Sequence, residues 1–85
     1  MNNFYRFISI YSFLESCIID GSCNDNIHYL MDTCWYFMND IIELSLENLL
    51  CFKDEILATY EVQYNEPLLK ILPVIENIEK ELPNV

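Results

Sequence analysis

The sequence predicts a small all-α protein, an antiparallel bundle of three or four helices, and three observations support this prediction. Apolar residues recur at intervals of three and four along most of the chain, as in helices that bury one face. The 85 residues include one glycine and three prolines, fewer than a turn-rich β fold needs. Hydrophobic residues make up 53% of the chain, too many for a disordered segment. We therefore expect one folded domain over residues 1–85.

The first helix is predicted over residues 3–19. Asn2 or Asn3 can cap its start, and Gly21 suits the left-handed conformation that often ends a helix. The expected apolar face consists of Phe4, Phe7, Ile8, Tyr11, Leu14 and Ile18.

A long run without glycine or proline begins at Asn24 and ends only at Pro67. A single helix of about 40 residues would be about 60 Å long, which is too long for a domain of this size. Ser45 can cap a new helix start with its hydroxyl, so we predict helices over 25–43 and 46–62. Their expected inner faces are Ile27, Leu30, Met31, Cys34, Met38 and Ile41, with Trp35 in the core beside them, and Leu46, Leu49, Leu50, Ile56, Leu57 and Tyr60.

The last helix is predicted over residues 67–82, with Pro67 in its first turn. Pro73 lies inside it, so either the helix kinks there or a turn precedes a helix over 73–82. The expected apolar face is Leu68, Ile71, Leu72, Ile75, Ile78 and Leu82. The stretch "TYEVQYN" also alternates like a strand, so helix and strand both stay open for residues 58–66.

The charge of the chain is segregated. The net charge is −10, and residues 15–66 alone hold eleven acids and one base. Such a field repels nucleic acid and anionic membranes and attracts basic partners over about 8–10 Å. Solubility is the simpler explanation, although charge that serves only solubility need not be segregated.

The four cysteines are expected to be reduced thiols in a cytoplasmic protein. The stretch "RFISIYSFLESC" ends in a lipobox-like Leu14-Glu15-Ser16-Cys17, but its glutamate and its serines make it a poor export signal. The apolar run is also too short and polar to span a membrane.

No motif predicts catalysis, a metal site or a cofactor. Cys23-x4-His28-x5-Cys34 has zinc-type ligands in a spacing that matches no usual zinc site. The chain lacks a glycine-rich phosphate loop and any nucleophile motif, so we expect a non-enzymatic protein.

The candidate binding site is a row of acids in the middle of the chain. If this region is one helix, side chains three, four or seven residues apart share a face. If Ser45 divides the run, the row becomes two patches on adjacent helices, which could still converge. Like charges at such spacings repel by about 0.2–0.5 kcal/mol per pair. Because no bases in the row neutralise these acids, they indicate an external partner. A solvated helix face is the alternative explanation. We name the predicted row the acidic stripe; it comprises Asp32, Tyr36, Asp40, Glu43, Glu47, Asp54 and Glu61. Tyr60 and Tyr64 lie near it in the sequence and are candidate contact residues.

The stripe "WYFMNDIIELSLENLLCFKDE" on a small, apolar and acidic helical chain resembles the bacterial immunity proteins of colicin and contact-dependent inhibition systems. It looks closest to the helical colicin D-type group. The resemblance covers size, charge and helical layout. It implies a cytoplasmic inhibitor whose acids occupy the basic substrate cleft of a toxin nuclease.

Two other functions stay open. The first is a phage- or plasmid-encoded nucleic-acid mimic that inhibits a restriction or CRISPR effector. The second is a helical assembly subunit, because a chain with so many apolar residues can expose an apolar face and form a homodimer.

Overall fold

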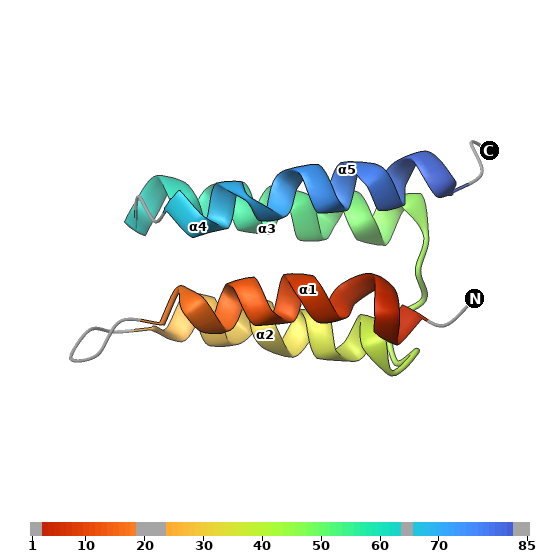
Figure 1. The fold of residues 1–85 in the computed structure, drawn as a ribbon, viewed down its shortest axis with the longest axis horizontal. Coiled ribbons are helices and arrows are strands. Elements are labelled where there is room, and N and C mark those ends of the chain that lie inside the picture. The colour runs from red at the N-terminus through yellow and green to blue at the C-terminus, as the bar shows by residue number, and fades with distance from the viewer. Residues whose placement is uncertain (1–2, 19–23, 64–65, 83–85) are drawn as a thin grey trace.

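The computed structural model describes residues 3–18, 24–63 and 66–82, and this part of the chain contains helices and connecting segments but no strand. The helices are α1 (Asn3–Ser16), α2 (Asp25–Met38), α3 (Leu46–Gln63), α4 (Glu66–Leu69) and α5 (Ile71–Glu81). α1 and α2 form one antiparallel pair, and α3 forms a second pair with α4 and α5 (Figure 1). The prediction of a small all-α bundle is confirmed.

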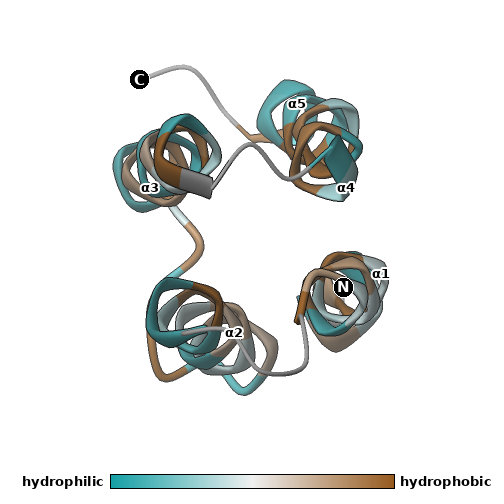
Figure 2. Cartoon of the chain, turned by 90° about the vertical axis from the view of Figure 1, so that its left-hand side faces the viewer, coloured by the Kyte–Doolittle hydropathy of each residue, from teal (hydrophilic) through white to brown (hydrophobic). Residues whose placement is uncertain are grey.

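Seen end-on, α2 and α3 lie side by side on one side of the bundle, and α1 lies beside α4 and α5 on the other (Figure 2). Elements from the two ends of the chain are therefore neighbours, and Arg6 of α1 forms an ion pair with Glu81 of α5 at 3.2 Å. The start of α1, the end of α2, the start of α3 and the end of α5 gather at one end of the bundle (Figure 1). We call it the linker end, because residues 39–45 join the two pairs there.

An aromatic cluster in the core joins the two helix pairs. The rings of Phe7 and Phe37 are stacked with centroids 4.9 Å apart, and Phe52 of α3 lies 5.7 Å from Phe37. All three side chains are fully buried. Aliphatic side chains from every helix complete the core, including Ile10, Leu14, Ile27, Leu30, Leu49, Ile56, Leu68, Ile71, Ile75 and Ile78.

Both predicted helices of the first pair end earlier than expected. α1 stops at Ser16 rather than at residue 19, because the N–H groups of Cys17 and Ile18 bond carbonyls three residues back, at 3.0 and 3.2 Å, in a tighter turn. The predicted stop at Gly21 lies outside the described residues.

α2 ends at Met38 rather than at residue 43 because Asp40 adopts a left-handed conformation, with a φ of 58°. The N–H of Asp40 donates to the carbonyl of Phe37 at 3.3 Å, and the N–H of Ile41 donates to that of Tyr36 at 2.9 Å. This pair of hydrogen bonds is a Schellman motif, which usually has glycine where this chain has Asp40. Aspartate tolerates the left-handed region better than most residues.

The predicted cap of α3 is confirmed. The N–H of Asn48 donates to the Ser45 Oγ at 3.2 Å, and the N–H of Leu49 donates to the Ser45 carbonyl at 2.9 Å. α3 continues to Gln63, so the described part of residues 58–66 is helix rather than strand. Residues 64–65, including Tyr64, lie outside the described residues.

The predicted interruption near Pro73 is confirmed, but it lies earlier in the chain. α4 ends at Leu69 and α5 begins at Ile71. Pro73 has no N–H to donate to the carbonyl four residues back, and its ring crowds that carbonyl, which belongs to Leu69. The helix therefore breaks before the proline, and Pro73 lies in the first turn of α5, where a missing N–H costs nothing.

Some predictions of the core were wrong. Trp35 is 47% exposed and Ile41 is 66% exposed, and Phe4, Ile8 and Leu50 are exposed as well. In their place Ile10, Phe37 and Phe52 are fully buried. Most of the other predicted core positions are buried as expected, among them Leu14, Leu30, Leu49 and Ile75. The wrong predictions arose because apolar residues also lie beside the buried face of a helix.

Candidate partner-binding surface

All seven residues of the acidic stripe are exposed. Asp32 and Tyr36 lie on α2, and Glu47, Asp54 and Glu61 lie on α3. Asp40 and Glu43 lie in the connecting segment 39–45 rather than on a helix. The acidic stripe is therefore divided into two short rows on α2 and α3, as expected for a break at Ser45, with Asp40 and Glu43 in the segment between them.

Each row points away from the core. On α2, Asp32 and Tyr36 are four residues apart and lie opposite the buried Leu30 and Cys34. On α3, the three acids recur every seven residues, two helical turns, and lie opposite the buried residues Leu49 and Ile56. Because α2 and α3 are neighbouring helices of the bundle (Figure 2), we refer to the two rows as the α2 ridge and the α3 ridge.

A polar contact bridges the seam between the ridges. The hydroxyl of Tyr29 on α2 donates a hydrogen bond to the Oε1 of Glu55 on α3, at 3.3 Å. The negative charge of Glu55 and this hydrogen bond raise the pKa of Tyr29, because both disfavour the phenolate. Glu55 is thus a seventh carboxylate, beside the six of the stripe. The sequence prediction missed it because a contact between two helices leaves no regular spacing in the sequence.

The ion pairs among the described residues leave the stripe uncompensated. Arg6 pairs with Glu81, and Lys53 pairs with Glu76 at 3.8 Å. Both glutamates belong to α5 and neither belongs to the stripe. The base nearest to the stripe in sequence, Lys53, thus turns toward α5, and the excess negative charge stays on the α2 and α3 side.

Two acids of the stripe also have local structural roles. Asp40 occupies the left-handed position after α2, and its Oδ1 accepts a hydrogen bond from the Nδ2 of Asn3 at 2.8 Å. Glu47 lies in the first turn of α3, where the helix dipole favours a negative charge. These two positions therefore have a reason to be acidic that does not involve a partner.

The candidate tyrosines differ in their accessibility. Tyr36 is exposed on the α2 ridge, whereas Tyr60 is half-buried and packs against the core. Tyr36 is therefore the better candidate for a contact residue.

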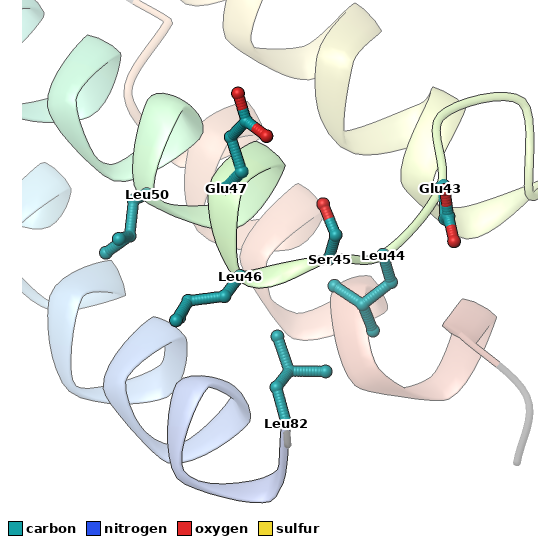
Figure 3. Close-up of a pocket in the computed structure, with 7 residues that line it drawn as sticks. All are labelled: Glu43, Leu44, Ser45, Leu46, Glu47, Leu50 and Leu82. Carbon is teal, nitrogen blue, oxygen red and sulfur yellow. The ribbon is translucent and has the colours of Figure 1, made fainter. Parts of the chain in front are cut away.

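A cleft with a volume of about 630 Å³ opens at the linker end, beside the α3 ridge. Figure 3 shows that Leu82, from the end of α5, points toward Leu46 and Leu44, while the Glu47 carboxylate points away from them. The sequence prediction missed this cleft, because Leu82 is 36 residues from Leu46 and reaches it only through the fold. The lining consists of four leucines, one serine and two acids of the stripe: Leu44, Leu46, Leu50, Leu82, Ser45, Glu43 and Glu47.

The three described cysteines are free thiols. Cys17 and Cys34 are buried and Cys51 is exposed. The Cys34 thiol donates to the Phe7 carbonyl at 3.4 Å, and burial raises its pKa to about 12, which keeps it protonated. Within the described ranges, no three His, Cys, Asp or Glu residues lie close enough together to hold a metal ion. Cys23 lies outside those ranges.

None of the helices in the described ranges has the length and apolar character that crossing a bilayer requires. Comparison with protein-family models, with curated proteins and with solved structures gave no match for this chain. The resemblance to immunity proteins therefore stays a prediction.

Proposed function

We propose that this protein is a non-catalytic inhibitor of the immunity type, which neutralises a basic toxin nuclease in the bacterial cytoplasm by occupying the cleft that holds nucleic acid. The observation that carries this proposal is the exposed, uncompensated row of acids on α2, the segment 39–45 and α3. Both ion pairs within the described residues take their carboxylates from α5. Neither of these two ion pairs involves an acid of the stripe.

The mechanism is competition with phosphate. A nuclease is basic where it holds the backbone of its substrate, because phosphate contacts supply much of the affinity. Carboxylates presented to those lysines and arginines exclude the substrate without any chemical step. Attraction between opposite charges also speeds encounter, which reaches about 10⁸–10⁹ M⁻¹s⁻¹ in the most favourable complexes at low salt.

The test begins with the genes next to this one, and a basic nuclease encoded there is the partner to assay. The triple variant Glu47→Gln, Asp54→Gln, Glu61→Gln should raise the Kd at least tenfold and restore cleavage of nucleic acid. The control variant Glu15→Gln, Asp25→Asn, Glu66→Gln removes the same charge from exposed acids outside the stripe and should retain inhibition. Equal effects of the two triple variants, or an affinity independent of salt, would contradict the proposal.

A second candidate function, a helical assembly subunit, is favoured by an exposed apolar patch on the α1–α2 pair. Phe4 and Ile8 are one turn apart on α1, and both are exposed. The ring centroid of Tyr11 on α1 lies 6.2 Å from that of the exposed Trp35 on α2. Light scattering on the purified protein distinguishes this candidate, since an assembly subunit should be larger than its 10.1 kDa chain at micromolar concentration.

A further inference from the structure

The cleft at the linker end combines an apolar lining with negative charge. Leu44, Leu46 and Leu50 line it from the connecting segment and α3, and Leu82 closes it from α5 (Figure 3). Leu50 is 39% exposed, so part of its side chain contacts water. We refer to this site as the leucine cleft.

The charges around the leucine cleft restrict its occupant. Glu43 and Glu47 lie on its lining, and none of the described residues that line it is a lysine or an arginine. An anionic membrane or a nucleic acid would meet these carboxylates unfavourably. A second copy of the chain, with a net charge of −10, would bring four bases, of which Arg6 and Lys53 already pair with α5. The complementary occupant is an apolar side chain flanked by lysine or arginine.

We propose that the leucine cleft anchors the basic partner by receiving one leucine-sized side chain, while Glu43 and Glu47 pair with the lysine or arginine residues beside it. This inference rests on the proposed function in that the partner is basic. It adds an apolar anchor, which the acidic ridges by themselves do not offer. Residues that dominate binding energy lie in well-packed pockets from which the surrounding contacts exclude water.

The experiment measures binding of two labelled peptides to the full chain by fluorescence anisotropy at 20 and 300 mM NaCl. The first peptide is Lys-Arg-Lys-Leu-Leu-Lys-Arg-Lys, and the second has serine in place of both leucines. We expect the leucine peptide to bind about tenfold more tightly, as burial of one leucine side chain predicts. We expect both peptides to bind more weakly at the higher salt concentration.

Two matched variants locate the site. Leu50→Asn places a polar group in the leucine cleft and should abolish the preference for the leucine peptide. Leu69→Asn changes a leucine that is 38% exposed on α4, at the opposite end of the bundle, and should retain the preference. Circular dichroism of both variants confirms that they are folded.

The outcomes separate the two proposals. Equal, salt-dependent binding of both peptides, or a preference that survives Leu50→Asn, overturns the leucine cleft as an anchor and leaves the acidic surface as the binding site. Absence of binding by either peptide at 20 mM NaCl overturns the anchor and contradicts the proposed function as well.

Discussion

At the scale of single residues, Asp40 has both a structural and a potential binding role. Its backbone adopts a left-handed conformation that most side chains disfavour. Its carboxylate accepts a hydrogen bond from the side-chain amide of Asn3, at the start of α1. It therefore ends α2, connects it to α1 and adds a charge to the stripe. A substitution that tests binding at Asp40 must therefore keep the end of α2 and the contact with α1 intact.

We predict that Asp40→Ala lowers the free energy of unfolding by about 1–2 kcal/mol, because alanine has no side chain that compensates the left-handed conformation. Asp40→Asn should change it by less than about 0.5 kcal/mol, since asparagine tolerates this conformation and its amide oxygen can accept the same hydrogen bond. Urea denaturation measures both values. An equal loss in the two variants would mean that the charge, and not the backbone, stabilises this turn.

Cys34 predicts a dependence of stability on pH. Burial raises the pKa of its thiol to about 12, whereas a thiol in the unfolded chain titrates near 8.5. At pH values above about 8.5, the thiol of the unfolded chain releases a proton that the folded chain retains. The free energy of unfolding therefore falls as pH rises, by about 1.4 kcal/mol per pH unit from this group.

Urea denaturation at pH 8 and pH 10 checks this prediction. The stability of the native sequence should fall more steeply over that interval than the stability of Cys34→Ala, which has no thiol to titrate there. Parallel slopes would show that Cys34 is accessible to solvent in the folded protein.

At the scale of the helices, the end of each helix is determined by its local hydrogen bonds. The hydroxyl of Ser45 accepts the N–H of Asn48, and this bond separates α3 from the segment before it. Pro73 similarly separates α5 from α4. These local signals divide a run of apolar residues into helices that are short enough to fold back on each other.

We predict that Ser45→Ala lowers the free energy of unfolding by about 1 kcal/mol, because an N–H in the first turn of α3 loses its partner. The control is Ser12→Ala, on the exposed side of α1, which should be neutral or slightly stabilising since alanine favours helix. Thermal denaturation followed by circular dichroism measures both. A neutral Ser45→Ala would show that packing alone defines the start of α3.

At the scale of the whole molecule, stability depends on a small core under a large net charge. The aromatic cluster of Phe7, Phe37 and Phe52 connects α1 and α2, which form one helix pair, with α3 of the other pair. A protein of this size has a total stability of only about 4–13 kcal/mol. One side chain of this cluster therefore contributes a large share of the total.

We predict that Phe52→Ala costs about 3–5 kcal/mol, since it leaves a cavity between the two helix pairs. Trp35→Ala should cost less than half as much, although tryptophan is larger, because its side chain is 47% exposed. Urea denaturation of the two variants compares them. A larger loss for Trp35→Ala would place the tryptophan in the core after all.

The net charge of −10 predicts that salt stabilises the fold. Mutual repulsion of the acids disfavours the compact state, and salt screens it. The melting temperature should rise between 20 and 500 mM NaCl, and less so for the triple variant of Glu47, Asp54 and Glu61. A melting temperature that falls with salt would mean that ion pairs such as Arg6–Glu81 outweigh the repulsion.

The amino-acid sequence was sufficient to predict the fold class, the number of long helices, the start of α3 at Ser45 and the interruption near Pro73. These features depend on local interactions, which act over three or four residues and can be recognised in a short stretch. The exposure of the acids was also predictable, because a carboxylate without a nearby base avoids the core.

Three features required the packing of the helices against each other. The burial of Phe37, and not of Trp35, depends on which of the apolar side chains of α2 meet the neighbouring helices, and the burial of Phe52 depends on the same choice on α3. The left-handed turn at Asp40 is stabilised by Asn3, 37 residues away in the chain. The leucine cleft exists because the end of α5 returns to the start of α3. Each of these contacts joins segments that are distant in sequence, and their formation depends on the free energy of the whole bundle rather than on any local pattern.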